Sequence, residues 1–164
     1  YVHISLADFY NKKGLTEQSF EELKLGLANT QLDLKTKINL LVNYYQGNLS
    51  DQQKAHALEL SEVLMNAHPD EILSHTFYAT MLYENGEYAK ARPLFKEILA
   101  SDQGNYPLWE QLLFCDLNLQ DFTLLAKDSE EAVDIFPYGD HSIFYVVNWR
   151  LSFCCAVFCA KKVH

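Results

Sequence analysis

The amino-acid sequence predicts an all-α fold built from antiparallel pairs of helices. Only 6 Gly and 4 Pro interrupt the 164 residues, which favours helices with short connections over a turn-rich β fold. The hydrophobic fraction is 49%, which is enough to bury a core. From Ala57 onward, similar helical faces also recur at a constant spacing of 34 residues, a pattern typical of repeat proteins.

The recurring face lies on the second helix of each predicted pair. Small and apolar residues follow one another at three- and four-residue steps, which places them on one side of a helix. The four faces are Ser19, Phe20, Leu23, Gly26 and Leu27; Ala57, Ser61, Leu64 and Met65; Ala91, Leu94, Phe95, Ile98 and Leu99; and Leu125, Ser129, Ala132 and Val133. We expect each of these faces to be buried.

Proline and glycine residues mark the predicted helix ends. Pro69 and Pro137 follow two of the second helices at equivalent points, and proline cannot continue a helix. Gly14 and Gly86 follow the first helices of two pairs. A glycine at this position adopts the left-handed conformation without a Cβ penalty, so we expect tight turns at both.

The second pair departs from the period. Ser19 and Ala57 are 38 residues apart, four more than the repeat, and we place the extra length in a longer turn at residues 46–49. Ser50 and Gln53 follow this turn with the spacing of a capping box. The next helix is therefore predicted to begin directly after Ser50.

This pattern resembles the tetratricopeptide repeat. The residues that carry the resemblance are Tyr78, Ala79, Gly86, Tyr88, Ala91, Phe95 and Ile98 in one unit and Trp109, Leu125, Ala132 and Pro137 in the next. The resemblance implies a right-handed superhelical solenoid, an α-α superhelix. Its four helix pairs would occupy approximately residues 1–33, 34–71, 72–105 and 106–139.

In this family, a concave groove lined by the first helix of each pair commonly binds an extended or helical peptide. The resemblance implies a peptide-binding groove formed by Asp8, Asn11, Lys12, Asn39, Asn43, Thr76, Thr80, Tyr83, Glu110, Phe114 and Asn118. Asparagine amides can hydrogen-bond a peptide backbone, and Tyr83 and Phe114 could anchor the ligand. The alternative is that these residues are only the solvated face of a spacer.

One branch of the family clamps the carboxylate at the end of its partner with Lys, Asn and Arg. Asn43 matches one of the Asn positions, whereas Ile4, Asp8, Thr76 and Thr80 occupy the places of the basic residues. We therefore do not expect that ligand.

The last residues, 140–164, begin like the first helix of a fifth pair but become an atypical apolar helix. Residues 143–160 approach the length of a membrane span, although Asn148 and Arg150 lie near the middle of the segment. We favour a buried or self-associating helix, with a homodimer through residues 143–160 as the alternative function, that of an assembly element.

No residue pattern indicates catalysis, so we expect a protein that is not an enzyme, without metal or cofactor. The net charge of −9 argues against nucleic-acid binding and leaves a protein or peptide as the expected partner. Cys154, Cys155 and Cys159 lack the paired spacing of a zinc site and are interpreted as small apolar residues, with a metal or redox site as the alternative.

Two features bear on the origin and the compartment of the protein: the sequence of the repeats and the start of the chain. The repeats resemble those of bacterial multi-repeat proteins, which are often exported, so cytoplasm and periplasm are both compatible. The chain begins at Tyr1 without a leader, and we expect it to be part of a longer protein.

Overall fold

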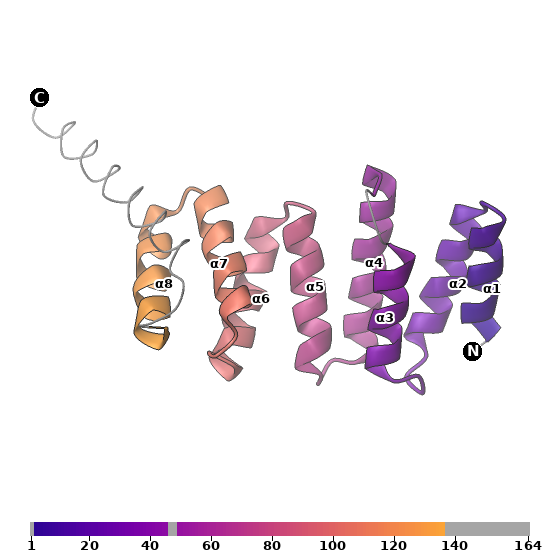
Figure 1. The fold of residues 1–164 in the computed structure, drawn as a ribbon, viewed down its shortest axis with the longest axis horizontal. Helices are drawn as coiled ribbons and strands as arrows, with labels where there is room; N and C mark the ends of the chain where they lie inside the picture. Colours follow the sequence, from indigo (N-terminus) through magenta and orange to yellow (C-terminus); the bar gives the residue numbers. More distant parts are fainter. Residues whose placement is uncertain (1, 46–48, 137–164) are drawn as a thin grey trace, which may run out of the picture. The chain divides into compact units, whose positions relative to one another are not determined.

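The computed structural model describes residues 2–45 and 49–136 of the chain, and these residues form helices joined by short turns (Figure 1). The helices are α1 (Val2–Lys12), α2 (Thr16–Ala28), α3 (Leu34–Tyr44), α4 (Asp51–Ala67), α5 (Ile72–Glu84), α6 (Tyr88–Ser101), α7 (Tyr106–Asn118) and α8 (Phe122–Ile135). No strand occurs among the described residues, so the predicted all-α class is confirmed for this part of the chain. The described residues form two compact units, one before and one after the bond between Glu87 and Tyr88.

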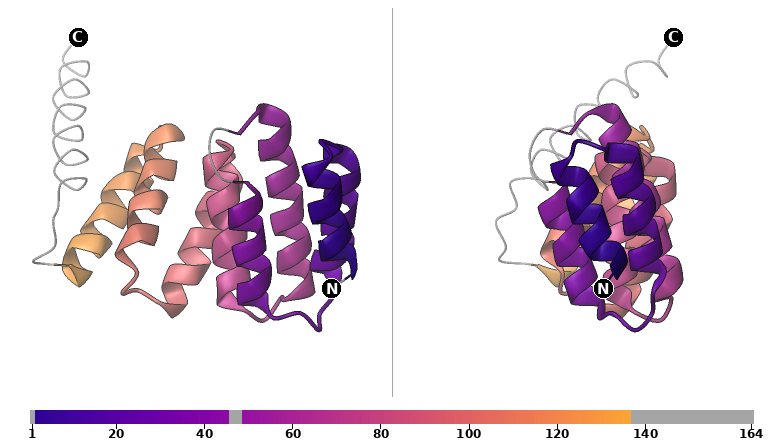
Figure 2. Two further views of the ribbon diagram at one scale, coloured as in Figure 1. Left: turned by 45° about the vertical axis from the view of Figure 1, so that its right-hand side comes forward. Right: turned by 90° about the vertical axis from the view of Figure 1, so that its right-hand side faces the viewer.

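The first unit is organised around α4. This helix lies between α2 and α5, and α1 packs closely against α2 (Figures 1 and 2). An added Cβ at Gly26 of α2 would lie 2.6 Å from Cδ1 of Ile4, so glycine permits the close approach of α1 and α2. The core consists of Ala7, Phe20, Leu23, Leu27, Leu34, Leu41, Leu60 and Leu64. Because isolated helices of this length are marginal in water, their stability depends on this shared core.

In the second unit, α7 packs against both α6 and α8. Its buried residues include Phe95 of α6, Trp109 and Leu112 of α7, and Leu125 of α8. The indole nitrogen of Trp109 donates a hydrogen bond of 2.9 Å to the carbonyl oxygen of Gln103. This bond satisfies the one polar atom that the ring brings into the core.

A network of charges also joins the three helices of the second unit. Arg92 of α6 pairs with the buried carboxylates of Asp116 on α7 and Asp128 on α8, and Lys96 pairs with Asp128 and Glu131 at 2.8 and 2.7 Å. Burial raises the pKa of Asp116 to about 6, although Arg92 opposes this shift. Removing one cation would leave a buried carboxylate uncompensated, so the network has a structural role.

The predicted second-helix faces are buried at most positions. Buried members are Ser19, Phe20, Leu23, Gly26, Leu27, Ala57, Ser61, Leu64, Ala91, Phe95, Ile98, Leu99, Leu125, Ser129 and Ala132. Met65 and Leu94 are half-buried. The prediction is wrong for Val133, which is 38% exposed. The buried residues of α8 also include Asp128, and their mean direction lies about 90° around the helix from Val133.

The predicted helix ends also agree with the structure. Ser50 caps α4, and both hydrogen bonds of its capping box with Gln53 are present. Pro69 follows the cap residue of the same helix. Gly14 and Gly86 have left-handed backbone conformations, with φ values of 72° and 78°. At Gly14 this conformation lets the chain turn from α1 into α2, and these two helices pack against each other.

Several expectations concern residues outside the described part of the chain. They are most of the long turn at 46–49, the helix end at Pro137, the terminal segment 140–164 with its three cysteines, and the dimer interface at 143–160. Within residues 2–45 and 49–136, no helix is both long enough and apolar enough to cross a membrane. The pairing of helices and the superhelical arrangement remain predictions.

The turn after α7 provides a test of this backbone geometry. Gln120 lies 34 residues after Gly86 and also has a positive φ, of 58°. The left-handed conformation costs a non-glycine residue roughly 1–2 kcal/mol, more than the entropic cost of about 0.5–1 kcal/mol that glycine brings. We expect Gln120→Gly to raise the free energy of unfolding in urea by about 0.5–1 kcal/mol.

The matched variant is Gly86→Ala, whose added Cβ meets no atom within 4 Å, so that only backbone strain is introduced. It should lower the free energy of unfolding by about 1 kcal/mol. Changes of the same sign in the two variants would show that the two turns do not share this conformation.

Candidate functional site

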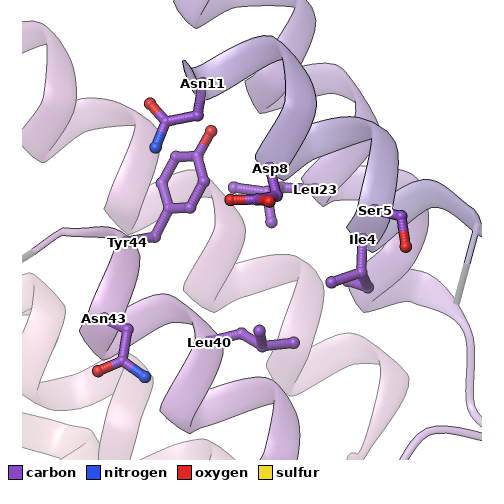
Figure 3. Close-up of a pocket in the computed structure, with 8 residues that line it drawn as sticks. All are labelled: Ile4, Ser5, Asp8, Asn11, Leu23, Leu40, Asn43 and Tyr44. Atoms are coloured by element: carbon purple, nitrogen blue, oxygen red, sulfur yellow. The ribbon is translucent and has the colours of Figure 1, made fainter.

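A pocket of about 430 Å³ lies between α1 and α3 in the first unit (Figure 3). Its lining residues are Ile4, Ser5, Asp8 and Asn11 of α1, Leu23 of α2, and Leu40, Asn43 and Tyr44 of α3. Three of them, Asp8, Asn11 and Asn43, belong to the groove that the sequence predicts. The structure therefore brings predicted residues from two helices to one pocket.

Helical periodicity explains why these residues share the pocket. Ile4, Asp8 and Asn11 follow one another at four and three residues along α1, and Leu40 is followed by Asn43 and Tyr44 along α3. Residues at these spacings lie on the same side of a helix. Each helix thus contributes one wall with both apolar and polar side chains.

The pocket brings polar, charged and apolar side chains together. In Figure 3 the amide of Asn11 and the hydroxyl of Tyr44 lie near each other, and Ile4 and Leu40 point toward each other from the two walls. The carboxylate of Asp8 lies between these two pairs. The pocket therefore offers hydrogen-bonding groups, an apolar surface and one negative charge to the same ligand.

Tyr44 connects the two walls. Its hydroxyl donates a long hydrogen bond of 3.4 Å to the carbonyl oxygen of Ala7 on α1, which also accepts a bond of 2.7 Å from the hydroxyl of Ser19. Burial and the nearby Asp8 carboxylate raise the pKa of Tyr44 to about 12. The hydroxyl consequently keeps its proton at neutral pH and can both donate and accept hydrogen bonds.

Asp8 is the only charged residue among the eight that line the pocket. Its carboxylate forms an ion pair of 2.6 Å with Lys12, one helical turn along α1, and both side chains are largely exposed. Exposed pairs at this spacing typically contribute only about 0.3–0.5 kcal/mol. Lys12 is therefore held weakly and can be displaced by another cation.

The wall formed by α3 is fixed by a buried lysine. Lys37 is fully buried, and its ammonium donates hydrogen bonds of 2.6 Å to the carbonyl oxygen of Leu27 and 2.8 Å to Nε2 of His68. Leu27 lies in the last turn of α2, and His68 is the cap residue of α4. Because α3 itself packs only lightly against α4, these bonds are important for its position.

The environment of this pair favours a neutral imidazole. Burial lowers the pKa of Lys37. Burial and the neighbouring Lys37 ammonium also lower the pKa of His68, while Glu71 and Asp33 act in the opposite direction. The unprotonated Nε2 can accept the hydrogen bond from Lys37, whereas a protonated ring would face a like charge.

The remaining predicted groove residues do not line this pocket. They are Lys12, Asn39, Thr76, Thr80, Tyr83, Glu110, Phe114 and Asn118. The hydroxyls of Thr76 and Thr80 donate to carbonyl oxygens of their own helix, and the amide of Asn118 donates to the carbonyl oxygen of Phe114. These bonds use local acceptors, which a pattern of polar residues does not reveal.

A second pocket in the first unit was not expected from the sequence. Its volume is about 240 Å³, and it is lined by Leu41, Val42, Tyr45, Leu49, Ala57, Phe77 and Met81. The lining is apolar except for the hydroxyl of Tyr45, and it contains no charged residue. This pocket therefore lacks the mixture of groups that distinguishes the site between α1 and α3.

Two other kinds of site are considered for the described part of the chain, a metal site and a reactive cysteine. No group of three or more His, Cys, Asp or Glu residues is placed to hold a metal ion in residues 2–45 and 49–136. Cys115 is buried, and burial raises the pKa of its thiol to about 12. That thiol stays protonated at neutral pH and is a poor nucleophile.

No protein-family model matches the chain, and no curated protein sequence matches it significantly.

The contact between Lys37 and His68 predicts a dependence of stability on pH. Because the folded pKa of His68 lies below its ordinary value of 6.5, the unfolded chain binds a proton first as the pH falls. This group should therefore lower the free energy of unfolding below about pH 6.5, by no more than about 1.4 kcal/mol per pH unit for one proton.

His68→Gln should reduce this pH dependence, because the glutamine side chain can accept the bond from Lys37 and does not titrate. His75→Gln is the matched control, since His75 contacts the carbonyl oxygen of Pro69 and not Lys37. Urea unfolding between pH 5 and 7.5 measures both variants. An unchanged slope in His68→Gln would exclude this contact as its source.

Proposed function

We propose that this chain is a peptide- or protein-binding scaffold of the tetratricopeptide type, and that the pocket between α1 and α3 forms part of its binding groove. The right-handed superhelical solenoid inferred from the sequence belongs to the same proposal. The observation that carries it is the position of the pocket. It lies between the first helices of the first two predicted pairs, where the family resemblance places a ligand.

The lining of the pocket is suited to a short stretch of peptide. A volume of about 430 Å³ lies within the usual range of binding pockets and can accommodate a few side chains. Asn11 and Asn43 provide amide groups that can both donate and accept hydrogen bonds, as a peptide backbone requires. Ile4 and Leu40 provide apolar surface for a side chain.

The fixed position of the two walls also supports binding. α1 is held against α2 by close packing at Gly26, and α3 is held by the bonds of Lys37. A pocket with ordered walls loses little conformational entropy when a ligand enters, so more of the contact energy appears as affinity.

The test uses an immobilised library of peptides with acetylated and amidated ends, so that terminal charges do not contribute. The tightest binders are then titrated by fluorescence anisotropy. We expect Asn43→Ala to weaken their binding about five- to tenfold, corresponding to one hydrogen bond of roughly 1 kcal/mol. Asn11→Ala should act in the same direction.

Asn66→Ala is the matched control. Asn66 is exposed on α4 in the same unit, and it is neither a predicted groove residue nor a lining residue of the pocket. Its substitution should change the affinity less than twofold, and the melting temperature of each variant shows whether the fold is retained. Equal losses for Asn66→Ala and Asn43→Ala, or the absence of any binding peptide, would contradict the proposal.

A further inference from the structure

We propose that the pocket between α1 and α3 selects a basic residue, Lys or Arg, of the bound peptide. This inference rests on the proposed function and names the ligand class of the same site. It follows from the type and arrangement of the groups in the pocket.

The negative charge of the pocket is concentrated at one position. Asp8 is the only charged residue of the lining, and Figure 3 shows its carboxylate between the Asn11–Tyr44 pair and the Ile4–Leu40 pair. The side chains of Asn11, Asn43 and Tyr44 can direct additional oxygen atoms toward a cation. A ligand with an ammonium or guanidinium group would find charge-assisted acceptors at this place.

The apolar surface beside Asp8 matches the rest of a basic side chain. Lys and Arg carry several methylene groups between the backbone and the charged group, and they commonly lie with this stem along apolar surface. Ile4 and Leu40 provide such a surface within the same pocket. A small cation without a stem would leave these residues without a contact. A basic side chain would contact both the carboxylate of Asp8 and the apolar surface.

Lys12 shows how a basic group would be accommodated. It already places an ammonium nitrogen 2.6 Å from Oδ2 of Asp8, but it does so from the solvent side with an exposed side chain. A peptide cation would replace Lys12 and add the contact of its stem with Ile4 and Leu40. Exchange of one ion pair for another costs little electrostatic energy, so the apolar contact decides in favour of the ligand.

The net charge of the chain also favours a basic ligand, and it acts over longer distances. The net charge of −9 attracts cationic peptides and repels acidic ones, an effect that decreases with ionic strength. An acidic side chain could approach Lys12, but in the pocket it would meet the carboxylate of Asp8. A basic ligand is therefore favoured over an acidic one both at a distance and in contact.

The experiment extends the peptide titrations to sets that differ at one position, with Lys, Arg, norleucine or Glu. Norleucine keeps the aliphatic stem and lacks the charge. We expect Lys and Arg peptides to bind at least fivefold more tightly than the norleucine peptide, and the Glu peptide to bind most weakly. Asp8→Asn should abolish the difference between Lys and norleucine while the norleucine peptide still binds.

Two further variants test whether the preference for Lys comes from Asp8 and its ion pair with Lys12. Asp134→Asn removes the same charge from an exposed position on α8 in the second unit, and it should preserve the preference for Lys. Lys12→Met removes the internal competitor and should tighten binding of the Lys peptide about two- to threefold. If Lys12→Met instead weakens a tightly bound Glu peptide, the pocket selects acidic ligands and the inference is wrong.

The possible failures are distinguishable. If peptides bind in an Asn43-dependent manner but Lys and norleucine peptides bind equally, the proposed function stands and the basic specificity is wrong. The same conclusion follows if Asp8→Asn leaves the preference intact. If no peptide in the sets binds, both the proposed function and this inference are contradicted.

Discussion

The buried ammonium of Lys37 fixes the position of α3, and the candidate site depends on that position. A buried charge is costly unless it is compensated, and here the carbonyl oxygen of Leu27 and the imidazole of His68 compensate it. These two groups belong to the end of α2 and the cap of α4, so one side chain connects three helices. Since α3 has only 11 residues and would be marginal alone, its wall of the pocket is only as stable as these contacts and its apolar packing.

Much of the fold could be predicted because it follows from local rules that repeat. The face beginning at Ala91 and the turn at Gly86 depend only on helical spacing and glycine geometry, and both are observed. The burial of Lys37 could not be predicted in the same way. It lies beside Leu34 and Leu41 in a helical pattern, where a lysine is normally expected at the solvent-exposed edge. Its burial depends on acceptors outside its own helix, 10 residues before it and 31 residues after it along the chain.

The candidate site was predictable only in part for a similar reason. Asp8, Asn11 and Asn43 were expected from the register of the repeats, and the structure places them at one pocket. Leu23 and Tyr44 were not expected there, because their contribution depends on how closely α1 approaches α2 and α3. The pattern of polar residues along a helix also does not distinguish a side chain that faces a ligand from one that is hydrogen-bonded to its own helix.

Backbone amide NMR of the ¹⁵N-labelled chain, titrated with a library-selected peptide, shows whether a peptide binds between α1 and α3. We expect the largest chemical-shift changes at Ser5, Asp8 and Asn11 and at residues 40–44, with smaller changes in the second unit. Changes centred instead on the apolar pocket around Phe77, or spread evenly over the chain, would contradict it.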